Sequence, residues 1–222
     1  MADIVLFGAG AIADVAHACI DNDSEHRVVG FIVDPAYAVR DTHRGLPLVG
    51  LDHAVERFPP RAHRALAAVG YHDMNRLRLA RLQDLEALGY ALHTHIGSGG
   101  WGAAAVAPGA FVMEGRSLQP EVTVGRGAFV WSGADVGHHS TLDAGVWVTS
   151  GASIGGHARI GARAFLGLGC TVGHRVSVGE GAFIGAATKV SREVGPGEVH
   201  IGADGQKGAL DADRFLRFAV NR

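Results

Sequence analysis

Two adjacent histidines, His138 and His139, stand in the stretch ADVGHHSTL, inside a tract that is otherwise rich in glycine and valine. A neutral imidazole accepts a proton near neutral pH, so it can act as a general base toward an attacking amine or hydroxyl. If that group attacks a thioester, the carbonyl oxygen gains negative charge and needs a fixed hydrogen-bond donor. The fold of the tract decides whether such a donor lies beside the imidazole.

A second set of candidate residues begins near the N-terminus, where GAGAIA at 8–13 follows an apolar run and opens a helical segment. Backbone N–H groups at such a turn can bind a phosphate. Asp34 ends the second apolar run, where a carboxylate could bind a ribose or base. Because this half is short, we expect a mononucleotide site for a nucleotide-linked sugar. The expected contacts are Gly8, Gly10, Ala11, Ile12, Asp34 and Gly70.

The elements that must position these residues alternate between apolar runs and helical segments over residues 1–95. The runs DIVLF, RVVGFIVD and RALAAVG read as buried strands, separated by helical segments such as AIADVAHACID and LDHAVERF. A further helix in MNRLRLARLQDLEALG carries a leucine stripe and ends at a glycine. This βαβαβ order predicts a small, Rossmann-like α/β unit with a parallel sheet.

The tract that holds His138 and His139 has a period of six. Every sixth residue is aliphatic, without exception, and the residue two positions before it is usually small. The aliphatic series is Val106, Val112, Leu118, Val124, Val130, Val136, Leu142, Val148, Ile154, Ile160, Leu166, Val172, Val178, Ile184 and Val190. Six fits neither a 3.6-residue helix nor a simple strand, but it fits a prism with short strands as faces and turns as corners.

Three hexapeptides close one coil of such a prism, so the series predicts about five coils, with residues 18 apart stacked about 4.8 Å from each other. One stacked column then holds His138, Gly156 and His174, and the next holds Glu121, His139, His157 and Arg175. His138 lies two residues past an inward valine, at a corner and facing outward. We therefore expect it to be available for chemistry.

The repeat tract resembles the hexapeptide-repeat acyltransferases, whose fold is a left-handed parallel β-helix. Together with the N-terminal half, it resembles the sugar acetyltransferases of the sialic-acid and bacillosamine type. The resemblance implies acetyl-CoA as acyl donor, a UDP- or GDP-linked sugar as acceptor, and a homotrimer with its site between subunits. The expected parts are a nucleotide-sugar-binding domain at 1–95, a β-helix at 96–205 and a tail helix at 206–222.

In this family a histidine at a V-N-H-D/E corner is the base, and VGHH matches that corner, so the resemblance implies His138 as base. It also implies the backbone N–H of Gly156, one coil on, as the donor to the thioester oxygen. The family's acid is replaced by His139; Glu121, Asp135, Asp143 or a group from a neighbouring subunit are possible substitutes. Trp147 stands where relatives often carry a second histidine, and it could stack on pantetheine or fill a trimer interface. The expected coenzyme contacts are Trp147, Gly156, Leu168, Gly185 and Ala186.

Composition excludes several classes of protein. A net charge of −2 argues against a nucleic-acid-binding protein. No run of 18 uncharged apolar residues is present, so we expect no membrane span. Cys19 and Cys170 are the only cysteines, which predicts a reducing, cytoplasmic setting without disulfides, with Cys170 in the core.

N-acetylation of a nucleotide-linked amino sugar is our first expectation, and O-acetylation of a sugar such as a sialic acid uses the same base. A non-catalytic nucleotide-sugar-binding protein is a second class, favoured by the absence of the family's acid. A metal-dependent enzyme like the γ-type carbonic anhydrases is a third, because His139 and His157 could share an ion. No third ligand is evident from the sequence, so we expect no metal.

Overall fold

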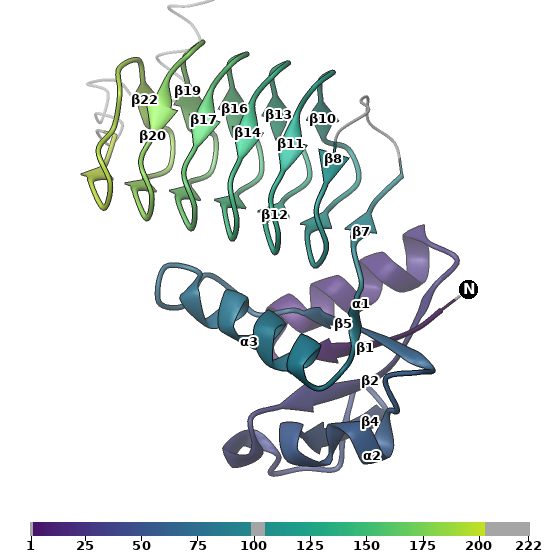
Figure 1. Ribbon diagram of the computed structural model, residues 1–222. Helices are drawn as coiled ribbons and strands as arrows, with labels where there is room; N and C mark the ends of the chain where they lie inside the picture. The colour runs from purple at the N-terminus through teal and green to yellow at the C-terminus, as the bar shows by residue number, and fades with distance from the viewer. Residues whose placement is uncertain (1, 99–104, 203–222) are drawn as a thin grey trace, which may run out of the picture.

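A computed structural model describes residues 2–98 and 105–202 of the chain. A column of short strands packs along one side against an N-terminal half made of a sheet and helices (Figure 1). The helix that we expect at 206–222 lies outside the described residues.

The N-terminal half contains one mainly parallel sheet. Its strands are β1 (Asp3–Phe7), β2 (Arg27–Val33), β3 (Thr42–His43), β4 (Leu46–Gly50), β5 (His63–Ala67) and β6 (Ala91–Leu92). Among the described residues they lie in the order β3-β4-β2-β1-β5-β6, and only the β3–β4 pair is antiparallel. The predicted alternation of strands and helices is confirmed, and β3, β4 and β6 extend the sheet beyond the three strands that the sequence indicated.

Helices cover both faces of this sheet. They are α1 (Ala11–Asp23), α2 (Ala54–Arg57) and α3 (Arg76–Ala87), with 3-10 turns η1 (Pro35–Tyr37) and η2 (Leu51–His53). Successive side chains of a strand point to opposite faces, and in β1 Ile4 and Leu6 join the cluster that contains α1, while Val5 and Phe7 join the cluster of α2 and α3. Both faces are therefore apolar, which explains why the strands read as continuous hydrophobic runs.

A glycine is required where β1 turns into α1. Gly8 has a φ of +119°, and a Cβ atom at this position would lie 2.6 Å from the carbonyl oxygen of Ala68. No other residue fits this conformation and this contact. The turn is therefore held against the end of β5, which places the Gly8 region beside Gly70.

The column is built from two-residue strands in three parallel sheets. The first sheet contains β7 (His95–Ile96), β9 (Phe111–Val112), β12 (Phe129–Val130), β15 (Trp147–Val148), β18 (Phe165–Leu166), β21 (Phe183–Ile184) and β23 (Val199–His200). The second contains β10 (Ser117–Leu118), β13 (Asp135–Val136), β16 (Ser153–Ile154), β19 (Thr171–Val172) and β22 (Lys189–Val190). The third contains β8 (Ala105–Val106), β11 (Thr123–Val124), β14 (Thr141–Leu142), β17 (Arg159–Ile160) and β20 (Ser177–Val178).

The register of these sheets confirms the period inferred from the sequence. Asp135 pairs with Ser153, and Thr141 pairs with Arg159, each 18 residues further along. Every aliphatic residue of the six-residue series is buried in the column except Val106, which is partly buried. The arrangement fits a left-handed parallel β-helix joined to an N-terminal α/β region. Cys170 is fully buried, as we expected.

An aromatic residue precedes the aliphatic one on nearly every rung of the first sheet, and these rings face the N-terminal half. The series recurs every 18 residues: Phe111, Phe129, Trp147, Phe165 and Phe183. Phe129 stacks on Trp147 with ring centroids 5.1 Å apart. Trp147 is only 2% exposed and shares a core with residues of β1 and α1. Its own chain covers most of the Trp147 ring, which argues against the expected role in a trimer interface and leaves little of the ring for pantetheine to stack on.

Arg78 of α3 ties the two halves together. Its Nε donates to the carbonyl oxygen of Gly127 and its Nη2 to that of Gly145, both at 2.8 Å, and its Nη1 donates to Oδ1 of Asn75 at 2.9 Å. The guanidinium also lies over the rings of Phe129 and Trp147. Burial lowers the pKa of Arg78 to about 9, which leaves it charged at neutral pH.

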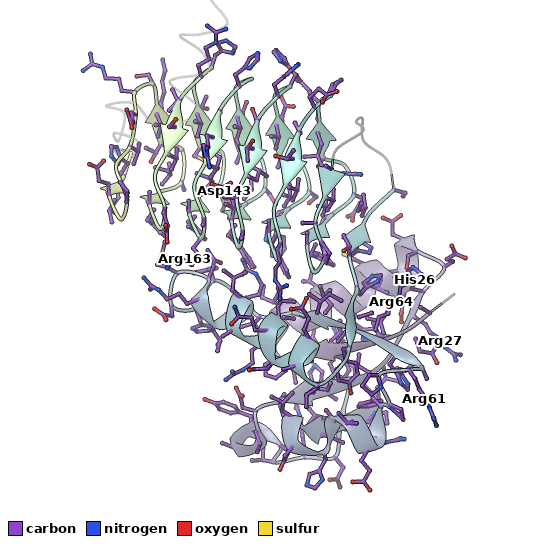
Figure 2. The ribbon with its side chains drawn as sticks, viewed as in Figure 1. His26, Arg27, Arg61, Arg64, Asp143 and Arg163 are labelled. Atoms are coloured by element: carbon purple, nitrogen blue, oxygen red, sulfur yellow. The ribbon has the colours of Figure 1, made fainter. Side chains whose placement is uncertain are left out.

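The start of α3 makes another contact with the column. The side-chain amide of Asn75 donates to the carbonyl oxygen of Arg163 at 2.9 Å, and Arg163 lies at the corner nearest α3 (Figure 2). Leu79 and Leu82 pack against Gly127 and Gly145, whose bare Cα atoms leave room for them. No helix in the described ranges has the length and hydrophobicity to cross a membrane.

Candidate active site

The histidines occupy one edge of the prism, which we call the histidine edge. It lies between the second and third sheets and consists of the corners 119–122, 137–140, 155–158 and 173–176. The stacked residues Glu121, His139, His157 and Arg175 all have φ between 57° and 63°. A non-glycine residue in this left-handed conformation is uncommon. The shared conformation fixes the direction in which successive side chains leave the edge.

His138 and Gly156 lie beside each other on neighbouring coils, as the sequence predicted. A Cβ atom on Gly156 would lie 2.8 Å from Nε2 of His138, so any other residue here would force the imidazole to move. Within the described chain, the N–H of Gly156 makes no hydrogen bond. An imidazole nitrogen and a residue with an unbonded backbone N–H therefore lie next to each other on neighbouring coils.

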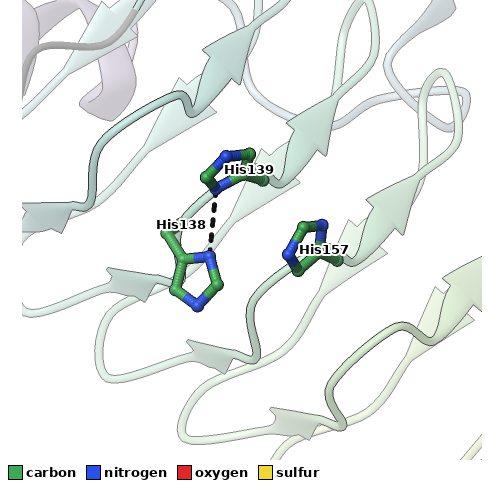
Figure 3. Close-up of side chains that lie close together, drawn as sticks. All are labelled: His138, His139 and His157. Carbon is green, nitrogen blue, oxygen red and sulfur yellow. Dashed lines mark hydrogen bonds between the residues drawn. The ribbon is translucent and has the colours of Figure 1, made fainter.

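The other nitrogen of the His138 ring contacts His139. Their Nδ1 atoms are 3.1 Å apart (Figure 3). The backbone N–H of His138 donates to Oε1 of Gln119 at 3.0 Å. Neither Glu121, Asp135 nor Asp143 makes a hydrogen bond to either imidazole in the described structure, and Asp143 pairs with Arg159 at 3.5 Å instead. Within one chain, His139 is thus the ring's polar partner.

His157 completes a group that the sequence did not reveal. Its ring stacks on that of His139 with centroids 4.8 Å apart, and it meets the ring of His138 edge-on at 5.1 Å. Ligand atoms of the three imidazoles all lie within 4.8 Å of one another. His157 is thus a third nearby imidazole, which the sequence analysis did not connect with His138 and His139. Desolvation first, and then the neighbouring His139 and His138, hold the pKa of His157 below its ordinary value.

A cleft of about 630 Å³ lies at the carboxyl ends of β1 and β5. Five of the six predicted substrate contacts line it, and the structure brings them together from two turns: Gly8, Gly10, Ala11, Ile12 and Gly70. His72 and Tyr71 also line it, although the sequence analysis did not select them. The cleft has the position that a nucleotide takes in open parallel sheets.

Asp34 lies in an adjoining hollow of about 360 Å³ that shares Gly8 and Gly10 with this cleft. Its carboxylate is ion-paired with Arg81 of α3 at 2.8 Å. A ligand that binds Asp34 must therefore compete with Arg81 or share the carboxylate with it. Arg40, which lines the same hollow, contacts His43 at 2.6 Å, and His43 in turn contacts Asp14 at 2.7 Å.

A third cleft of about 510 Å³ opens along the edge between the first and second sheets, which we call the cleft edge. The predicted coenzyme contacts Trp147, Leu168, Gly185 and Ala186 all line it. Ile12 and Tyr71 line both this cleft and the one beside Gly8, so the two are continuous. Gly156 is absent from this set, because it belongs to the histidine edge. Trp131 and Tyr71 are aromatic lining residues that the sequence analysis missed.

The fold and these clefts resemble those of hexapeptide-repeat, CoA-dependent sugar acetyltransferases, and comparison with solved structures finds the same likeness. Perosamine N-acetyltransferase from Caulobacter crescentus, solved as a variant with CoA and GDP-perosamine, matches with a TM-score of 0.82 and 25% identity. The match covers 94% of this chain and 98% of that one. No family model matches the chain, and no curated protein does.

A second solved structure agrees with this likeness. The acetyltransferase domain of PglB from Neisseria gonorrhoeae matches with a TM-score of 0.78 and 25% identity, over 91% of this chain and 97% of that domain. The same domain has been solved in complex with acetyl coenzyme A. The predicted resemblance to sugar acetyltransferases and the predicted use of a CoA donor are thus confirmed at the level of the class.

Proposed function

We propose that this protein transfers an acetyl group from acetyl-CoA to the amino group of a nucleotide-linked amino sugar. The observation that carries the proposal is the position of Nε2 of His138 against Gly156, whose backbone N–H makes no hydrogen bond in the described chain. The likeness to a perosamine N-acetyltransferase solved with GDP-perosamine supports an amine as acceptor and favours N-acetylation over O-acetylation. A UDP- or GDP-linked sugar would bind in the cleft lined by Gly8, Gly10 and Gly70.

The proposal assigns a role to each part of the chain. Residues 1–95 would form a Rossmann-like nucleotide-binding domain, and the described part of residues 96–205 would form a β-helix of about five coils. The parallel order of β4, β2, β1 and β5 supports the first assignment. The five-stranded second and third sheets, as described, support the coil count. A cytoplasmic location stays a prediction.

The residues of the histidine edge would divide the chemistry as follows. His138 accepts the proton of the sugar amine at Nε2 as the amine nitrogen bonds to the thioester carbon, and the Gly156 N–H stabilises the negative oxygen. His138 then returns the proton to the departing sulfur as the carbon–sulfur bond breaks, which yields the amide and free CoA. No covalent acyl-enzyme is needed.

His139 would act as a positioning residue in this scheme. If Nε2 of His138 is to accept a proton, its Nδ1 must carry the ring hydrogen, and the nearest acceptor is Nδ1 of His139 at 3.1 Å. A neutral imidazole thus takes the place of the acid that follows the histidine in the family. It fixes the tautomer without adding negative charge. The absence of the family's acid is the main argument for a non-catalytic sugar-binding protein, and a positioning role for His139 would remove that argument.

The positions of the two edges support a site shared between subunits. The continuous clefts adjoin the cleft edge, whereas His138 lies on the histidine edge. Six residue-to-residue steps along the backbone, from Ser150 to Gly156, separate the two edges of one chain, which is up to about 20 Å of extended backbone. A sugar bound beside Tyr71 therefore meets the base of a neighbouring copy more readily than that of its own chain. This is our reason to propose a homotrimer.

A thiol-release screen tests the proposed activity. Purified protein is mixed with acetyl-CoA and a panel of UDP- and GDP-linked amino sugars and their hydroxyl counterparts, and free CoA is measured. We expect release with at least one amino sugar and much less with its hydroxyl counterpart. Nucleotide-sugar binding without any thiol release would instead support the non-catalytic class.

A further inference from the structure

The group of His138, His139 and His157 has a property that acetyl transfer does not require. In the described chain these three side chains place ligand nitrogens from two neighbouring coils within 4.8 Å of one another. All three are exposed, so an ion can reach them from solvent. Figure 3 shows the three rings gathered around one space above the corners of the column.

The spacing suits a transition-metal ion. Zinc binds imidazole nitrogen at about 2.0–2.1 Å, so two ligand nitrogens of a tetrahedral site lie about 3.3 Å apart. The Nδ1 atoms of His138 and His139 are already 3.1 Å apart. His157 supplies the third ligand nitrogen, which lies within 4.8 Å of those of His138 and His139. Three imidazoles leave the fourth position of the ion open to water.

The backbone holds the three ligands in place. His139 and His157 share the left-handed conformation, with φ of 60° and 57°, and His157 N–H donates to the carbonyl oxygen of His138 at 2.8 Å. The corners therefore need not rearrange to bind an ion. Neutral nitrogen ligands favour zinc, copper or nickel over magnesium or calcium, which prefer oxygen.

We propose that His138, His139 and His157 form a binding site for a divalent transition-metal ion, and that Zn²⁺ bound there switches off the base. The ion takes the lone pair of Nδ1 of His138, so the ring hydrogen must move to Nε2. Nε2 then donates a hydrogen bond and cannot accept the proton of the amine. The inhibitory part rests on the proposed function, whereas the metal site does not.

Calorimetric titration with ZnCl₂ alone tests the site, with untagged, metal-free protein. We expect one Zn²⁺ per chain for the wild type and no binding of Mg²⁺. His157→Asn, which tolerates the left-handed backbone, is expected to weaken Zn²⁺ binding at least tenfold. His174→Asn is the matched control, an exposed histidine one coil further on, and it should bind Zn²⁺ within about twofold of the wild type. Equal binding by wild type and His157→Asn, or an equal loss in His174→Asn, would overturn the site.

Activity in the presence of Zn²⁺ tests the inhibition. Thiol release by the wild type should fall at least tenfold when the site is filled and return on addition of a chelator. His157→Asn should keep its activity at the same Zn²⁺ concentration. Full activity of Zn²⁺-loaded wild type would overturn the inhibitory part. If no sugar supports thiol release at all, the proposed function fails, while the calorimetric result still decides the metal site.

Discussion

At the scale of single residues, the site depends on which nitrogen of His138 faces which neighbour. Nε2 lies against Gly156, and Nδ1 lies 3.1 Å from Nδ1 of His139. In the proposed mechanism, Nε2 accepts the proton and Nδ1 makes the orienting contact. Replacing the family's acid by an imidazole keeps the orientation and gives up the charge that would stabilise the protonated ring.

Substitution of His139 tests this orienting contact. His139→Ala should lower kcat about ten- to a hundredfold with little change in KM, because the His138 ring loses the acceptor that fixes its tautomer. His139→Asn should stay within a few-fold of the wild type, since its amide oxygen can accept the same hydrogen bond and Asn tolerates the backbone. Steady-state kinetics measure both. Equal losses in the two variants would show that the contact has no positioning role.

At the scale of elements, the sequence predicted the strands of the column better than the contacts that join the column to the N-terminal half. The six-residue series shows directly which side chains fill the prism, because each coil repeats one geometry. The aromatic series from Phe111 to Phe183 has an equally regular 18-residue period, and it could have predicted the face that contacts the N-terminal half. Arg78 could not be predicted as buried, since its partners Gly127 and Gly145 are distant in sequence and offer only backbone oxygens.

Loss of Arg78 should therefore weaken the attachment of the two halves. Arg78→Met leaves the carbonyl oxygens of Gly127 and Gly145 without a donor, and we expect the free energy of unfolding to fall by about 2–4 kcal/mol. Arg76→Met, at an exposed position of the same helix, should change it by less than about 0.5 kcal/mol. Urea denaturation measures both variants. A similarly small effect of Arg78→Met would contradict the structural role.

The segment that links the two halves should also make the free energy of unfolding depend on pH. Burial first, and then the charges of His26, His95 and Arg64, lower the pKa of His93 from 6.5 to about 3. Below pH 6.5 the unfolded chain takes up a proton that the folded chain does not, so stability falls as the pH drops toward 3. At pH 5 this cost is about 2 kcal/mol.

Urea denaturation at pH 7 and pH 5 measures this effect. His93→Leu should lose about 2 kcal/mol less stability than the wild type between the two pH values. His53→Ala, a change at an exposed histidine, should follow the wild type. If the wild type and His93→Leu show the same pH dependence, His93 is not buried in its neutral form.

At the scale of the whole molecule, the chain divides the site between two edges of one prism. The sequence predicted both sets of residues, because turn glycines and the 18-residue spacing are visible in it. The 18-residue spacing places Leu168 and Ala186 on a different edge from His138, but it could not show which of the edges adjoins the N-terminal half. Nor could it show that Ile12 and Tyr71 join two clefts, because these side chains meet only through tertiary packing.

Mixed oligomers test the division of the site. His138→Ala removes the base, and Leu168→Arg blocks the cleft edge, so each protein alone should be inactive. Co-expressed in equal amounts, the two should regain about a quarter of wild-type activity, because random assembly pairs an intact base with an intact cleft in one site out of four. If each site lay within one chain, every chain would carry a defect and the mixture would stay inactive.

The most direct test of the account is the turnover of His138→Asn with the sugar that the wild type acetylates best. If Nε2 of His138 accepts the proton of the amine, kcat should fall about 10²- to 10⁴-fold while calorimetry shows unchanged binding of the nucleotide-linked sugar. His174→Asn, the same change one coil further along the edge, should leave kcat within about twofold. A His138→Asn enzyme that turns over at the wild-type rate would contradict the assignment of the base.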